Sequence, residues 1–162
     1  MAKAREIPGL YAEDSYAAAA AKIVTVRVQE LSEHSAGVLD LTDIERLHDM
    51  RVATRRLRAA LEVFGPCFPR KRLKQDLGQV KALADALGER RDRDVAIASL
   101  EGLSEKMATS DRVGIESMIR RLRGEQREAN ERLVPFVDES RLRSLCDRLY
   151  ELADSAGEGE DA

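Results

Sequence analysis

The chain has 162 residues, of which 43% are hydrophobic, 35% are charged and only 4% are aromatic, and it contains no Trp. This length provides for one domain with a core, and a core built from Leu, Ala and Val favours packed helices over sheets. The sequence has no apolar run of membrane-spanning length and no apolar stretch typical of a signal peptide near its N-terminus. Its two cysteines, Cys67 and Cys146, have neither a metal-binding nor a redox spacing. We therefore expect a cytoplasmic protein with reduced thiols.

The net charge is −3, but the charges are unevenly distributed along the chain. Residues 46–93 contain 13 Lys or Arg and 6 Asp or Glu, a net charge of +7, whereas residues 1–45 carry −4 and residues 94–162 carry −6. A basic segment within an acidic protein can focus a local positive potential. The overall charge therefore does not exclude an anionic partner.

The first predicted helix covers residues 10–34. Its apolar residues recur at steps of three and four, and five successive alanines favour the helical state. Gly37 is predicted to end the segment. The residues expected to face the core are Ala17, Ala20, Ala21, Val24, Val28 and Leu31.

The second predicted helix begins at a capping box, Thr42 to Glu45, and ends at Gly65-Pro66. At 100° per residue, a histidine and three arginines fall within an arc of about 80° on one side. The apolar residues fall on the opposite side. The cationic row is His48, Arg51, Arg55 and Arg58, and the apolar side is Met50, Ala53, Leu57, Ala60, Leu61 and Phe64.

A row of like charges gives up the favourable pairs of opposite sign that solvated helix faces normally contain. Only Glu62 lies within this row, at its far end. The row therefore indicates an anionic ligand, and the alternative is a solvated face that pairs with acids on neighbouring helices. Arg56 lies about 80–160° away from the row and can instead brace the bundle.

The third predicted helix begins near Arg70 and again separates charge from apolar residues. Lys71, Lys74 and Lys81 share an arc of about 80°. The helix can continue past Gly88, because apolar residues recur at Val95, Ala98 and Leu103. The predicted buried stripe is Leu73, Leu77, Val80, Ala84 and Leu87.

Two further helices are predicted, over residues 111–134 and 138–154. Pro135 is expected to end or bend the first of them, and its basic segment 120–127 is interpreted as a solvated face. The acidic segment 155–162 is predicted to be disordered. The predicted apolar residues are Val113, Met118, Ile119, Leu122 and Leu133 in the first helix and Leu142, Leu145, Leu149 and Leu152 in the second. The chain is therefore expected to be all-α: one antiparallel bundle of about five helices over residues 1–154.

Two sequence features resemble the CHAD family, the conserved histidine α-helical domains. The first is the pattern HxxRxxxRRLR that begins at His48, and the second is the segment ALGERRDRDVAIASL at 86–100. Both occur in the same order and about 30 residues apart. The resemblance covers residues 10–105 well and the remainder loosely.

This resemblance implies an all-helical fold that binds inorganic polyphosphate in a basic groove, without a metal or other cofactor. A typical family domain has two similar helical halves, each with its own motif helix, and this chain resembles one half. It therefore implies either a homodimer, for which the leucines of the fifth helix are the expected interface, or a single bundle with an open half-groove. A membrane partner is not expected.

The candidate site is basic and non-enzymatic. An alternative is a phosphohydrolase or phosphotransferase subunit that uses His48 with Asp92 and Asp94, although salt bridges from neighbouring arginines are the expected role of these aspartates. A second alternative is a nucleic-acid-binding module, which the scarcity of aromatic residues disfavours. The candidate polyphosphate-binding residues are His48, Arg51, Arg55, Arg56, Arg58, Lys71, Lys74, Lys81, Arg90 and Arg91.

Overall fold

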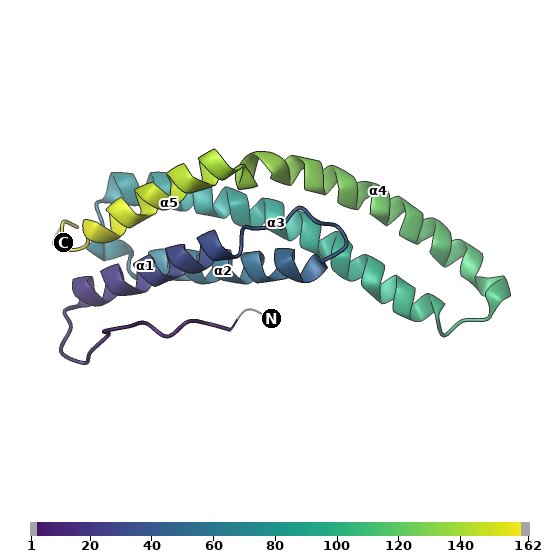
Figure 1. The fold of residues 1–162 in the computed structure, drawn as a ribbon, viewed down its shortest axis with the longest axis horizontal. Coiled ribbons are helices and arrows are strands. Elements are labelled where there is room, and N and C mark those ends of the chain that lie inside the picture. The colour runs from purple at the N-terminus through teal and green to yellow at the C-terminus, as the bar shows by residue number, and fades with distance from the viewer. Residues whose placement is uncertain (1–2, 160–162) are drawn as a thin grey trace.

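The computed structural model describes residues 3–159, and this part of the chain is all-helical, as predicted. Five α-helices and two short 3₁₀ turns follow one another, and none of the described residues forms a strand. In Figure 1, α3 runs along the whole molecule, with α1 and α2 on one side and α4 and α5 on the other. The helices are α1 (Tyr16–Glu33), α2 (Ile44–Val63), α3 (Arg70–Ser104), α4 (Arg112–Val137) and α5 (Glu139–Asp154), and the 3₁₀ turns are η1 (Gly65–Cys67) and η2 (Thr109–Asp111).

Helix α1 begins at Tyr16, six residues later than predicted. Ser15 caps the helix by accepting a hydrogen bond from the Ala18 amide at 3.1 Å. Upstream, the Asp14 carboxylate accepts a hydrogen bond from the Tyr11 amide. This bond closes a turn where the sequence predicted the first turn of the helix. The expected inward-facing positions of α1 are buried, apart from two alanines near its start that are half-buried. The predicted stop was close, because α1 ends at Glu33 and Gly37 adopts a positive φ of 72° in the following loop.

The predicted capping box at the start of α2 was wrong. The amide and the hydroxyl of Thr42 both donate to Asp40 Oδ1, at 2.8 and 2.7 Å, so the Thr42 side chain is occupied within the loop. Asp43 takes the cap position, but its carboxylate accepts a hydrogen bond from Arg46 Nε at 2.9 Å and caps no backbone amide. The predicted end is confirmed, because α2 stops at Val63 and Pro66 lies in the η1 turn.

Helix α3 is continuous through Gly88, as the resumed spacing indicated, but its second half does not bury the predicted residues. Val95, Ala98 and Leu103 are exposed, and Arg90, Asp94 and Ile97 are buried instead. The reason lies in α4, which packs along α3 and presents polar groups there, Gln126 among them. Polar partners on α4 favour an inward-facing ion pair over an apolar stripe.

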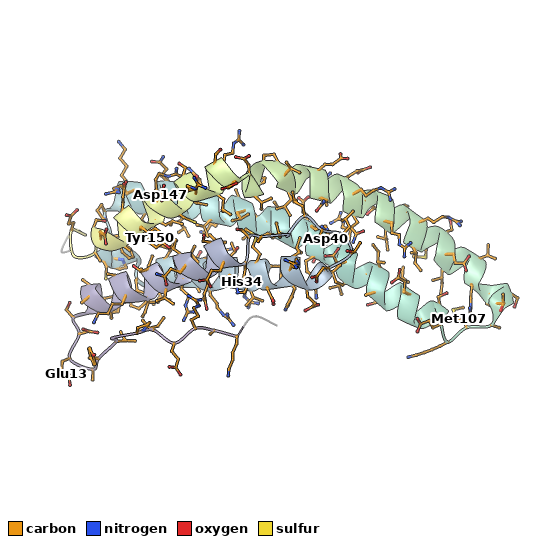
Figure 2. The ribbon with its side chains drawn as sticks, in the orientation of Figure 1. Glu13, His34, Asp40, Met107, Asp147 and Tyr150 are labelled. Atoms are coloured by element: carbon orange, nitrogen blue, oxygen red, sulfur yellow. The ribbon has the colours of Figure 1, made fainter. Side chains whose placement is uncertain are left out.

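Helix α4 continues through Pro135 and ends two residues later, at Val137. Of its predicted apolar side, Ile119 and Leu133 are buried and Leu122 is half-buried, whereas Val113 and Met118 are exposed. Figure 1 shows why: the far parts of α3 and α4 project beyond the other helices, so that each has only the other to pack against. We call the projecting hairpin from Val95 to Arg123 the arm, and Figure 2 places Met107 at its tip.

All four predicted leucines of α5 are buried, which confirms the stripe but assigns it to the core of this chain. Leu142, Leu145, Leu149 and Leu152 pack with buried residues of α1 and α3. They are therefore not available as a surface for a second copy, and this part of the dimer prediction was wrong.

The first residues after α5 pack against the helical bundle. Ser155 is buried, and the amide of Gly157 donates to the carbonyl of Cys67 at 2.9 Å. Residues 160–162 of the predicted disordered tail lie outside the described residues. Within residues 3–159 no helix combines the length and the apolar composition needed to cross a bilayer.

Candidate functional site

A groove of about 630 Å³ lies between α2 and α3, and the cationic row of α2 forms one of its walls. Arg51, Arg55 and Arg58 stand at successive turns of α2, while its apolar side is buried in the core. The predicted division of this helix into a core face and a cationic face is therefore what brings the three arginines together. Ala59 and Glu62 complete the α2 wall.

Two of these arginines have no hydrogen-bond or ion-pair partner among residues 3–159. No hydrogen bond or ion pair is formed by Arg51 or Arg55 within the part of the chain that the structure describes. Arg58 donates to Glu62 on its own helix at 3.1 Å, and Lys81 of α3 lies 3.1 Å from the same carboxylate. Lys81 and Arg58 together hold the pKa of Glu62 below its usual range. Glu62 thus neutralises one end of the groove and leaves the middle cationic on the α2 side.

The opposite wall is acidic, which the sequence analysis did not foresee. Asp85, Glu89 and Asp92 line it at successive turns of α3, together with Ala84 and Gly88. Glu89 pairs with Arg132 of α4 at 3.3 Å, whereas Asp85 and Asp92 form no ion pair within residues 3–159. The signal was present in the sequence as the spacing 85, 89, 92 on the face that also carries Lys81.

The three predicted lysines of α3, Lys81 included, lie outside the residues that line the groove. Lys71 and Lys74 are exposed on the first turns of α3 and do not line it. They precede Lys81 along the same helix, and neither forms an ion pair with another described residue. They can therefore extend a cationic surface from the groove toward the start of α3.

Arg56 faces α1, as its separate position on the α2 helix indicated. Its guanidinium lies 3.8 Å from Glu30, a buried carboxylate that also accepts hydrogen bonds from Arg27 and from the Arg5 amide, both at 2.7 Å. Burial alone would raise the pKa of Glu30, but these donors outweigh it and lower the pKa. Arg56 thus belongs to a cluster that ties α2 to α1 and to the N-terminal segment.

Arg90 is fully buried and has no surface with which to contact a polymer. It donates to Asp94 Oδ1 at 2.9 Å and to Asn130 Oδ1, and Gln126 donates to the same Asp94 oxygen at 2.6 Å. Asn130 in turn donates to the Leu39 carbonyl at 3.0 Å, which links α4 to the loop between α1 and α2. The expected salt bridge with a neighbouring arginine is confirmed for Asp94, whereas Asp92 forms none within residues 3–159. We leave Arg90 out of the proposed site.

Arg91 and His48 lie near the start of α2. Arg91 is half-buried, donates to the Ile44 carbonyl at 3.3 Å and lies 3.9 Å from Glu45. His48 is half-buried one turn before Arg51, outside the residues that line the groove, and its buried Nδ1 has no hydrogen-bond partner among residues 3–159. No group of three or more His, Cys, Asp or Glu side chains gathers as metal ligands among these same described residues.

Comparison with protein-family models identifies a family that matches most of the chain. The family model described as CHAD domain matches residues 22–162, a range that contains the motif helix, the segment 86–100 and both C-terminal helices. No curated protein and no solved structure matches the chain. The match therefore extends the resemblance seen in residues 10–105 to the end of the sequence.

Proposed function

Because this chain belongs to the CHAD domain family, we propose that it binds inorganic polyphosphate, without chemical turnover, in the groove between α2 and α3. The observation that carries the proposal is the pair Arg51 and Arg55. Both guanidinium groups stand in an open groove and form no ion pair with any described residue. Cationic side chains that form no ion pair among the described residues are suited to an anionic ligand.

The chemistry of the α2 wall and of the approach to the groove fits a chain of phosphates. The planar fork of an arginine matches two phosphate oxygens, and a lysine provides a movable point charge. Arg51, Arg55 and Arg58 would hold successive phosphates, and Lys81, Lys74 and Lys71 would continue the contact along α3. Polyphosphate has no bases, so this site needs no aromatic platforms.

The buried ion pair of α3 supports a binding role over the enzymatic alternative. A phosphohydrolase built on His48, Asp92 and Asp94 would need these groups to reach the ligand. Asp94 is buried and is held by Arg90 and Gln126, so only Asp92 lines the groove. The enzymatic alternative is tested by incubating polyphosphate with a high concentration of the protein and measuring the release of inorganic phosphate. We expect the rate of release to equal the uncatalysed rate.

Few aromatic side chains are placed as stacking platforms for nucleic-acid bases. Tyr16, one of the exposed aromatics, packs against Phe64 with tilted rings whose centroids are 4.9 Å apart, and its hydroxyl donates to the Val63 carbonyl. We therefore expect long-chain polyphosphate to compete effectively with both single-stranded and duplex DNA. Efficient displacement of bound polyphosphate by DNA at equal phosphate concentration would favour the nucleic-acid alternative.

The direct test is a titration with polyphosphate of defined length at 50 and 200 mM salt. By analogy with DNA, six or more phosphate contacts predict a loss of roughly 10³ in affinity between these salt concentrations. Arg55→Glu should weaken binding by about 10- to 100-fold, the range expected for a lost charge-assisted hydrogen bond. The control is Arg127→Glu, the same change at an exposed position on α4.

Helicity should be unchanged in both variants, because both side chains lie outside the core. An unchanged dissociation constant for Arg55→Glu, or an equal loss in Arg127→Glu, would remove the groove as the binding site. Absence of polyphosphate binding by the unmodified protein at low salt would remove the proposed function itself.

A further inference from the structure

We infer that the acidic wall of the groove selects a single narrow chain of phosphates and rejects duplex nucleic acid. The inference rests on the proposed function and adds a specificity to it. Asp85 and Asp92 are the residues that carry this role. In this role neither aspartate contacts the ligand. Both act through the negative electrostatic potential that they create opposite the arginines.

The two walls match in spacing and oppose in sign. Asp85, Glu89 and Asp92 follow the same three- and four-residue steps along α3 that Arg51, Arg55 and Arg58 follow along α2. The two helices pack side by side (Figure 1). Each arginine of the row therefore has carboxylates across the groove from it.

These opposite charges do not close onto one another. Within residues 3–159, no ion pair with an N···O distance of 4.0 Å or less joins Arg51 or Arg55 to Asp85 or Asp92. Glu89 is drawn away to Arg132, and Arg58 is held by Glu62. The arginines thus remain available to a ligand, while the two aspartates repel any phosphate that approaches their side.

The width of the ligand determines how strongly the aspartates of the acidic wall repel it. A single polyphosphate chain can lie against the α2 wall and keep its phosphates away from α3. A DNA duplex carries one charge per about 1.7 Å of its axis, divided between two strands that are separated by grooves of about 6 and 12 Å. When one strand contacts the arginines, phosphates of the duplex also come over the acidic wall.

The test compares two double variants that change the net charge equally. Asp85→Asn/Asp92→Asn removes the two carboxylates of the acidic wall that form no ion pair among the described residues, and Glu128→Gln/Glu131→Gln removes two exposed acids from α4. Dissociation constants for long-chain polyphosphate and for a DNA duplex are measured at one fixed salt concentration. The ratio of the duplex constant to the polyphosphate constant reports the selectivity.

We expect this ratio to fall about ten-fold in the groove variant, as for two screened repulsions of about three-fold each at a separation near 6 Å. In the α4 variant both ligands gain alike from the changed net charge, so the ratio should stay within about two-fold of the unmodified protein.

An unchanged ratio in the groove variant, or an equal change in both variants, would overturn the inference and leave polyphosphate binding intact. Failure of the unmodified protein to bind polyphosphate would instead overturn the proposed function, and the inference with it.

Discussion

The buried ion pair between Arg90 and Asp94 leads to the sharpest prediction for stability. Replacing Asp94 with Asn keeps the size of the side chain and an oxygen that can accept from Gln126, but removes the charge that compensates Arg90. Arg90 is among the largest fully buried side chains, so water cannot take over this role in the folded state. Removing one partner of a buried pair costs about 3–5 kcal/mol.

This cost is large for a domain whose total stability is typically about 5–15 kcal/mol. It corresponds to a fall in Tm of roughly 6–20 °C, since each kcal/mol shifts Tm by about 2–4 °C in a chain of this size. The measurement is urea unfolding followed by circular dichroism. Asp92→Asn is the matched control: the same substitution two residues away, on an exposed side chain, should change the free energy of unfolding by less than about 0.5 kcal/mol.

A second variant checks the explanation. If the loss in Asp94→Asn arises from an uncompensated guanidinium, adding Arg90→Met should recover part of it, because an apolar side chain of similar length needs no counter-charge. The reasoning would be refuted if Asp94→Asn unfolded within about 1 kcal/mol of the unmodified protein. It would also be refuted if the double variant were less stable than Asp94→Asn alone.

Three further outcomes are expected. Leu57→Asp should lower the free energy of unfolding by several kcal/mol, because it places a carboxylate in the core beneath the cationic row; a normal melting curve would mean that the faces of α2 are reversed. Burial raises the pKa of the Cys146 thiol to about 11, so only about a thousandth is thiolate at pH 8, and alkylation should be at least a hundred-fold slower in the folded protein than in denaturant; equal rates would contradict the burial. The homodimer stays a prediction and should be favoured by polyphosphate that bridges two copies; light scattering that gives a strict 18 kDa monomer with and without polyphosphate would end it.

Much of the fold could be predicted because Leu, Ala and Val recur at helical spacing. The four leucines of α5 and the apolar side of α2 were identified from this spacing alone, and the cationic face of α2 followed as its complement. The spacing of one helix does not reveal what packs against it, however. Val113 and Met118 have ordinary helical spacing, yet they are exposed because no third helix covers the arm.

Charged residues account for the other differences. The row of arginines could be found because it lies on one helix, whereas its acidic counterpart required the relative placement of α2 and α3. Arg90 was expected at the surface, where arginine is normally found. Its burial depends on polar partners that come from two helices. Gln126 lies 32 residues after Asp94 in the sequence, and Asn130 lies 40 residues after Arg90.

The length of α3 gives the molecule two parts of unequal resistance to local opening. The first half of the helix is packed among α2, α4 and α5, and the groove is built on it. The second half belongs to the arm and packs chiefly against α4, with Ile97 and Ile119 buried between them. The arm can therefore fray from its tip as far as the Arg90 network while the groove keeps its shape, since opening free energies follow local burial.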